Sequence, residues 1–219
     1  MAREPVRNDR EEILAGIRAA LRGSARAQNQ AGQRNYLHGT DAARAVMVAL
    51  FVERAAEYRA TVHRVEPGAE RAAIAQILGS RGVRRLVIPR DLPGEWVPEN
   101  VELFSDSDGA LAHTALDASD GVLTGCALAI AQTGTLVLDG GASQGRRALT
   151  LLPDYHLCVV RADQVVGLFP EAIRQLASVA GHGHQPITFI SGPSATSDIE
   201  LSRVEGVHGP RTLDILVIG

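Results

Sequence analysis

Short runs of β-forming apolar residues alternate with amphipathic helical segments along most of this chain. Such alternation is typical of a sheet with mostly parallel strands, because each helix returns the chain to the edge where the next strand begins. Helices then cover both faces of the sheet. The sequence therefore predicts an α/β fold with a mostly parallel sheet covered by helices.

The predicted elements are bounded by glycine, proline or polar residues. One long helix begins at Thr40 or Asp41, and another is capped by Asp163 and runs through Val179. Shorter helices are expected at 70–78 and 109–118. The predicted strands are 61–65, 85–88, 101–104, 122–123, 128–130, 135–138, 156–160, 187–190 and 213–218.

The N-terminal segment differs in character from the rest. Asn8 or Asp9 can cap a helix whose apolar face carries Ile13, Ile17 and Leu21. Residues 24–39 are polar and have no periodicity, which is typical of a linker. We therefore predict a helical arm with a polar linker over residues 1–39 and one α/β domain over residues 40–219.

The 219-residue chain has no lysine, and all 22 basic residues are arginine. This excludes Schiff-base chemistry and the Walker P-loop, since both need a lysine amine. The net charge of −3 gives no long-range attraction to nucleic acid or to an anionic membrane. There is no apolar run of membrane-spanning length and no signal-peptide core near the N-terminus, so we expect a cytoplasmic protein.

The two cysteines, Cys126 and Cys158, are too far apart for a Cys-x-x-Cys motif. Iron–sulfur clusters and structural zinc sites take several Cys or His ligands, so we expect neither in this chain alone. A disulfide is rare in a cytoplasm, and buried free cysteines are common. We therefore expect two small buried side chains.

Thr133-Gly134-Thr135 lies between two predicted strands. Gly134 permits a left-handed turn or a close approach of another backbone. The Thr133 and Thr135 hydroxyls and nearby amides could bind a carboxylate or phosphate. A simple turn or bulge in the sheet is the alternative, and the tripeptide suits it equally well.

A second polar cluster, residues 191–200, follows the predicted strand 187–190. Ligands of open α/β sheets bind beyond the carboxyl ends of strands. The cluster offers Ser191, Gly192, Ser194 and Thr196 as ligand-binding candidates, and Asp198 and Glu200 as general acids or bases. Ion pairing of the two carboxylates with arginines is the structural alternative.

Arg147 is the predicted anion-binding cation, since a guanidinium suits bidentate binding of a carboxylate or phosphate. The preceding loop, residues 140–145, is rich in glycine and could close over a site. Arg146 is expected to lie on the surface of a hairpin.

Among the histidines, His156 opens a predicted strand and His208 lies in a loop before the last strand. Both are ligand-binding candidates, with a structural role as the alternative. His182 and His184 are expected in a solvated loop, because two residues in a glycine-flanked loop rarely bind a metal without further ligands. We expect no metal site in the chain.

Together these segments resemble the LUD-domain family and, within it, the lactate utilization protein C group. The resemblance is carried by residues 121–125, 129–138, 147–156, 191–200 and 206–210, roughly the C-terminal half of the chain. One departure is Gln132, where the family often has Glu, which casts doubt on any role for an acid beside the Thr133 turn.

The resemblance implies an α/β fold similar to the NagB/RpiA/CoA-transferase-like superfamily. It also implies an accessory, cluster-free subunit of an assembly that oxidises L-lactate to pyruvate with partner proteins that carry iron–sulfur clusters. The alternative is a stand-alone isomerase- or CoA-transferase-like enzyme that acts on a small anionic metabolite. In that case Asp198 or Glu200 would be the acid, base or nucleophile and Arg147 would bind the anion.

Overall fold

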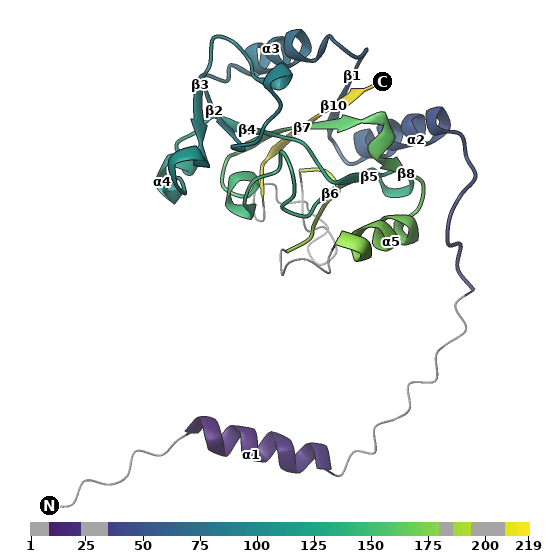
Figure 1. Ribbon diagram of the computed structural model, residues 1–219, viewed down its shortest axis with the longest axis vertical. Helices are drawn as coiled ribbons and strands as arrows, with labels where there is room; N and C mark the ends of the chain where they lie inside the picture. The colour runs from purple at the N-terminus through teal and green to yellow at the C-terminus, as the bar shows by residue number, and fades with distance from the viewer. Residues whose placement is uncertain (1–8, 23–34, 180–185, 194–208) are drawn as a thin grey trace, which may run out of the picture. The chain divides into compact units, whose positions relative to one another are not determined.

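The computed structural model describes residues 9–22, 35–179, 186–193 and 209–219 (Figure 1). The chain divides into two compact units, Met1–Tyr36 and Leu37–Gly219. The first unit contains helix α1 (Asp9–Arg22), whose acidic first turn suits the positive end of the helix dipole. Its apolar residues Ile13, Ile17 and Leu21 recur at four-residue spacing and are exposed. None of the helices in the described ranges has the length and apolar character of a membrane span.

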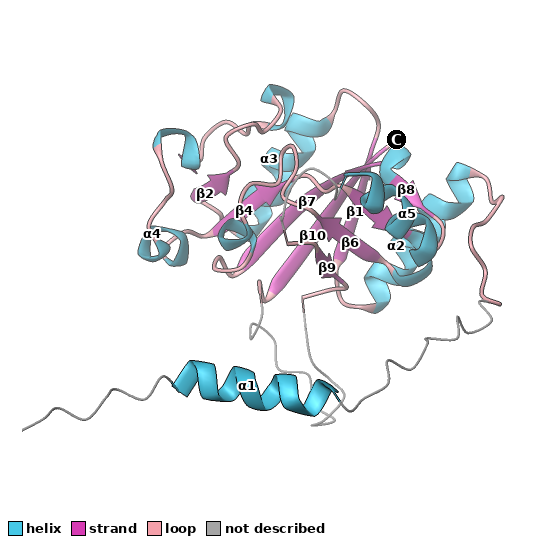
Figure 2. Ribbon diagram, turned by 60° about the horizontal axis from the view of Figure 1, so that its bottom comes forward, coloured by secondary structure: helices cyan, strands magenta, loops and turns pink. Residues whose placement is uncertain are grey.

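The second unit is built on a six-stranded sheet with the order β1-β10-β7-β4-β2-β3 (Figure 2). Every pairing between its strands is parallel, which confirms the predicted α/β class with a mostly parallel sheet. The strands are β1 (Thr61–Val65), β2 (Arg85–Ile88), β3 (Glu102–Ser105), β4 (Gly121–Thr124), β7 (Tyr155–Arg161) and β10 (Thr212–Ile218).

A smaller four-stranded sheet has the order β8-β5-β6-β9. Its strands are β5 (Leu128–Ile130), β6 (Thr135–Leu138), β8 (Val165–Val166) and β9 (Thr188–Ile190). Strand β6 runs antiparallel to both β5 and β9, and β8 runs parallel to β5. The β5–β6 hairpin closes through the 3₁₀ turn η3 (Ala131–Thr133) and Gly134, which has a left-handed φ of 59°.

Helices α2 (Arg44–Glu57) and α3 (Glu70–Arg81) cover opposite faces of the six-stranded sheet. Along β7, Cys158 and Val160 pack in the same core cluster as α2, whereas Leu157 and Val159 pack with α3. Successive side chains of a strand point to opposite faces, so both faces of the sheet are buried. The remaining helices are α4 (His113–Asp117) and α5 (Phe169–Val179).

Helix α5 covers one face of the four-stranded sheet, and the other face joins the core beneath α2. Ala172 and Leu176 of α5 pack with Leu128 and Ile130, whereas Ala129 of the same strand packs with α2. The unit is therefore layered in the order α3, six-stranded sheet, α2 with the four-stranded sheet, and α5.

The predicted helix from Asp163 to Val179 is wrong in its first part. A 3₁₀ turn, η5 (Ala162–Gln164), is followed by β8, and α5 begins only at Phe169. Val165 and Val166 pair with β5, a contact across more than thirty residues that sequence periodicity does not reveal. The Glu171 carboxylate then caps the helix by accepting a 2.7 Å hydrogen bond from the Leu168 amide.

An ion pair stabilises the amino-terminal edge of the six-stranded sheet. Asp214 is 1% exposed and accepts hydrogen bonds of 2.9 and 2.6 Å from Arg81, the last residue of α3. The Tyr155 hydroxyl donates a further 3.0 Å bond to the same carboxylate. Burial, together with Asp214, raises the pKa of Tyr155 above its ordinary value, so the phenol stays protonated and can donate.

We expect Arg81→Ala to lower the free energy of unfolding by about 3 kcal/mol, because it leaves a buried carboxylate without its cation. Arg85→Ala is the matched control, since it removes the more exposed pair of Arg85 and Asp120. That pair should contribute less than about 1 kcal/mol. Urea unfolding of both variants measures the difference, and equal losses would contradict this role of Asp214.

Candidate functional site

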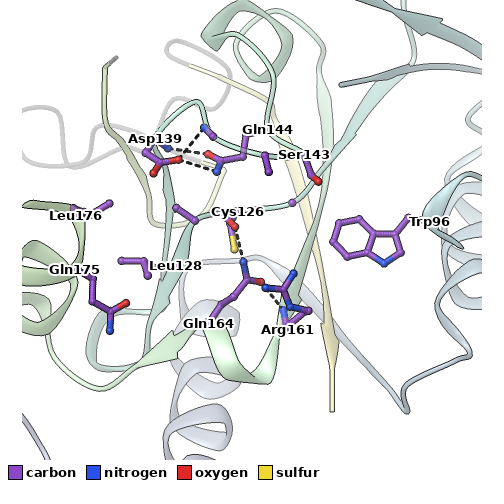
Figure 3. Close-up of a pocket in the computed structure, with 14 residues that line it drawn as sticks. Trp96, Cys126, Leu128, Asp139, Ser143, Gln144, Arg161, Gln164, Gln175 and Leu176 are labelled. Atoms are coloured by element: carbon purple, nitrogen blue, oxygen red, sulfur yellow. Dashed lines mark hydrogen bonds between the residues drawn. The ribbon is translucent and has the colours of Figure 1, made fainter. Parts of the chain in front are cut away.

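A cavity of ≈ 580 Å³ lies where the chain leaves the carboxyl ends of β4 and β7 (Figure 3). We call it the thiol cavity, because the Cys126 sulfur lies among its lining side chains. The carboxyl ends of parallel strands are where ligands of open α/β sheets bind. Its lining residues are Trp96, Gly125, Cys126, Ala127, Leu128, Asp139, Gly141, Ala142, Ser143, Gln144, Arg161, Gln164, Gln175 and Leu176.

One wall is a polar loop that follows β6. The Gln144 side chain donates a 2.8 Å hydrogen bond to the Asp139 carboxylate and accepts one of 2.8 Å from the Asp139 amide. Asp139 also accepts from the amide of Gly141 at 2.9 Å. These hydrogen bonds close the glycine-rich loop, residues 140–145, on itself.

Two side chains at and just after the end of β7, Arg161 and Gln164, form the lower rim in Figure 3. Gln164 donates a 2.7 Å hydrogen bond to the Cys126 carbonyl and accepts one of 2.9 Å from the Arg161 amide, so it ties the ends of β4 and β7 together. The Arg161 guanidinium pairs with Asp163 at 3.2 Å and is half exposed.

Trp96 forms another wall of the thiol cavity and packs against Gly125. A Cβ on Gly125 would lie 3.3 Å from the six-membered ring of Trp96 and 3.3 Å from the Ser143 side chain. A larger side chain at position 125 would therefore push the ring or the loop away. Gly125 is thus required for the close approach of Trp96 to the end of β4.

Beneath the cavity lies a buried cluster of Thr124, Cys126, His156 and Cys158. Thr124 Oγ1 and His156 Nε2 share a 2.8 Å hydrogen bond, and all four residues are nearly or fully buried. Contact with the Cys158 thiol, and then burial, raises the pKa of Cys126. The same contact lowers the pKa of Cys158, and His156 and Thr124 lower it further against the opposing effect of burial.

A second cavity, of ≈ 360 Å³, contains several of the residues predicted from the sequence. We call it the Arg147 cavity. It is built from η4 (Arg147–Thr150), which precedes β7, from the end of β9, and from residues before β10. The lining residues are Arg147, Thr150, Thr188, Phe189, Ile190, Ser191, Gly192, Pro193, Gly209 and Pro210.

Arg147 is held by its own turn. Its Nη1 donates a 3.1 Å hydrogen bond to Thr150 Oγ1. The Arg147 side chain is partly buried, and this burial lowers the pKa of its guanidinium. A partly desolvated cation attracts an anion more strongly than a fully hydrated one.

The structure brings the two predicted polar loops together. Thr135 Oγ1 shares 2.7 Å hydrogen bonds with Thr133 Oγ1 and with Ser191 Oγ, so the three hydroxyls form a chain. Gly134 and Gly192 both lie against the C-terminal end of α2. A Cβ on Gly134 would overlap the backbone at Ala55, and one on Gly192 would overlap the carbonyl of Tyr58. Both glycines have positive φ, 59° and 78°, so this part of the loops has a clear packing role.

Other predicted residues lie elsewhere. His156 is fully buried in β7 and lines neither cavity. Arg146 is not a free surface residue, because it pairs with Asp106 at 2.7 Å and donates a 2.6 Å bond to the Leu111 carbonyl. Ser194, Thr196, Asp198, Glu200 and His208 lie outside the described residues, as do His182 and His184.

Sequence reasoning missed most of the thiol cavity. Trp96 lies more than sixty residues before Arg161 and Gln164, and none of the three belongs to a motif. The sequence indicates this cavity only through the positions of Cys126 and Arg161. Both come shortly after the carboxyl end of a predicted strand, where ligands of open α/β sheets bind. Within the part of the chain that the structure describes, no three His, Cys, Asp or Glu side chains are grouped to hold a metal ion.

Comparison with known proteins shows what the chain is similar to. The LUD domain family matches residues 48–218. A Deinococcus radiodurans protein named lactate utilization protein C is 46% identical over 176 residues, which cover 80% of this chain and 81% of that protein. A protein of the same name from Shouchella clausii is 27% identical over 187 residues, 81% of each chain. The crystal structure of a DUF162 family protein from Deinococcus radiodurans has a TM-score of 0.71 and 40% identity, and the match covers 81% of this chain and 99% of that one.

We expect Gly134→Ala to destabilise the protein by more than about 3 kcal/mol, because a left-handed φ is combined with overlap on the α2 backbone. Gly82→Ala is the matched control. Gly82 has a similar φ of 69°, but a Cβ at this position would have no atom within 4 Å, so only the backbone strain of about 1 kcal/mol should appear. Thermal unfolding of both variants tests this, and similar melting temperatures would rule out the packing role of Gly134.

Proposed function

Since the chain belongs to the LUD domain family, we propose that it acts in lactate utilization as a subunit that carries no iron–sulfur cluster itself. In this role it works with iron–sulfur partner proteins that oxidise L-lactate to pyruvate. The observation that carries the proposal is the 46% identity, over 80% of this chain, with the relative named lactate utilization protein C.

The cysteine content supports the assignment of the clusters to the partners. The whole chain has two cysteines, fewer thiolates than an iron–sulfur cluster normally needs. Both are buried in the core between the sheets, 4% and 0% exposed. A cluster there would have to displace packed side chains of α2 and β7.

We assign the binding of a small carboxylate to the Arg147 cavity. A partly desolvated guanidinium recognises a carboxylate through two parallel hydrogen bonds. The Thr150, Thr188 and Ser191 hydroxyls in the lining add neutral donors and acceptors of the kind that suit a 2-hydroxy acid. Thr150 also fixes the Arg147 side chain, which lowers the entropy lost on binding.

The partnership predicts a physical association. Affinity-tagged full-length protein, drawn from a lysate of its native cell, should recover proteins whose absorbance changes on reduction as iron–sulfur clusters do. The untagged protein in the same lysate is the control. Recovery of the tagged chain without any iron-containing partner would contradict the proposal.

Ligand binding in the Arg147 cavity is tested by calorimetric titration with L-lactate and pyruvate. We expect Arg147→Gln to weaken binding by about tenfold or more, because a hydrogen bond to a charged group contributes about 1.5–3 kcal/mol. Arg161→Gln is the matched control, since it removes an arginine from the thiol cavity instead. Unchanged affinity in Arg147→Gln, or a loss confined to Arg161→Gln, would count against this assignment.

A further inference from the structure

The only two cysteines of the chain meet in the core beneath the thiol cavity. Cys158 is the in-register partner of Thr124, and Cys126 follows Thr124 by two residues. The Cys158 sulfur lies 3.6 Å from the carbonyl oxygen of Gly125, the residue before Cys126. The two side chains pack in the same buried core cluster, although they come from segments more than thirty residues apart.

The two thiols differ in their access to solvent. Cys126 lines the thiol cavity, and Figure 3 shows its sulfur between the polar loop and the lower rim. Cys158 is fully buried and lines no described cavity. A small molecule that enters the cavity therefore meets Cys126, whereas Cys158 is shielded in the core.

A proton acceptor stands beside the pair. His156 is two residues before Cys158 on β7, so the two side chains lie on the same face of the strand. Its Nε2 bonds Thr124, whereas its Nδ1 is buried without a hydrogen-bond partner among the described residues. Contact with His156 also favours the thiolate form of Cys158 and lowers its pKa. A buried polar atom without a partner is costly, and such atoms are often found where chemistry occurs.

We propose that Cys126 and Cys158 are a redox-active dithiol, which a small hydroperoxide entering the thiol cavity oxidises to a disulfide. The Cys126 thiol passes its proton to the Cys158–His156 pair beside it, its sulfur attacks the nearer peroxide oxygen, the O–O bond breaks, and the leaving oxygen takes a proton back from that pair. The products are a Cys126 sulfenic acid and an alcohol or water. The Cys158 sulfur then attacks the Cys126 sulfur, the S–O bond breaks, and water leaves. Two thiols lose two electrons and two protons, and the peroxide is reduced by the same two electrons.

The surroundings of the pair favour the disulfide over further oxidation. The resolving thiol is packed in the same buried cluster as Cys126, beside Thr124 and Gly125, so the second step needs no encounter from solution. The Arg161 and Gln164 side chains on the rim supply donors for the leaving oxygen. This reaction does not depend on lactate utilization, and either proposal can fail while the other holds.

The chain is well suited to a direct test by mass spectrometry, because cleavage after arginine separates the two cysteines. Cys126 falls in the peptide 91–146 and Cys158 in the peptide 148–161. Folded full-length protein is treated with hydrogen peroxide, its remaining thiols are alkylated under denaturing conditions, and the peptides are analysed without reduction. We expect a linked pair of these two peptides, lighter by two hydrogens than their sum, and loss of both free thiols within one chain.

Cys158→Ser and Cys126→Ser are the paired variants. Cys158→Ser should stop at the sulfenic acid on Cys126, which a dimedone-type reagent traps. Cys126→Ser should leave Cys158 reduced, because it does not face the cavity. Limited alkylation of the untreated protein should label Cys126 before Cys158.

Several results would overturn the proposal: both thiols intact after peroxide treatment, oxidation of Cys126 to the sulfinic acid with no linked peptides, or disulfides formed only between chains. Circular dichroism before and after treatment shows whether the protein is still folded. Linked peptides that form only after the fold is lost would also count against the proposal.

Discussion

The parallel pairing of β4, β7 and β10 in the middle of the six-stranded sheet is the constraint on which the rest of the structure depends. These strands are buried on both faces, so their backbone groups must be satisfied by their neighbours in the ladder. Both cavities follow from this pairing. The segments that leave β4 and β7 form the thiol cavity, and those that enter β7 and β10 contribute to the Arg147 cavity.

Much of the fold could be predicted because its signals are local. Strands β1, β2, β5 and β6 have the bounds predicted from their β-forming residues and their glycine, proline and polar flanks. The helix predicted to start at Asp163 shows that such local signals can fail. Residues 163–168 suit a helix start, but pairing of β8 with β5 decides their structure, and that pairing depends on tertiary contacts. In α2, likewise, residue type alone does not tell which valine is buried, since Val46 is 59% exposed and Val48 is buried.

The candidate site is also predictable only in part, because tertiary contacts decide which of its residues come together. Residue type singles out Thr133, Thr135 and Ser191, and the structure brings them together through hydroxyl contacts. The neighbouring Gly134 and Gly192, however, are explained by close packing on the end of α2, and no sequence motif reveals this packing. The thiol cavity depends on the order of strands in the sheet. Only that order brings Cys126 against Cys158, since neither residue has a neighbouring cysteine in the sequence.

The division of labour between this chain and its proposed partners follows from the chemistry that each can hold. Two buried cysteines and a cavity that contains Arg147 suit a protein that binds a small anion and leaves the iron–sulfur chemistry to its proposed partners. The most direct measurement is the rate at which the iron–sulfur partners oxidise L-lactate to pyruvate, with and without this chain. The account predicts that the rate collapses without it and returns when the purified protein is added. A full rate from the partners alone would contradict the account.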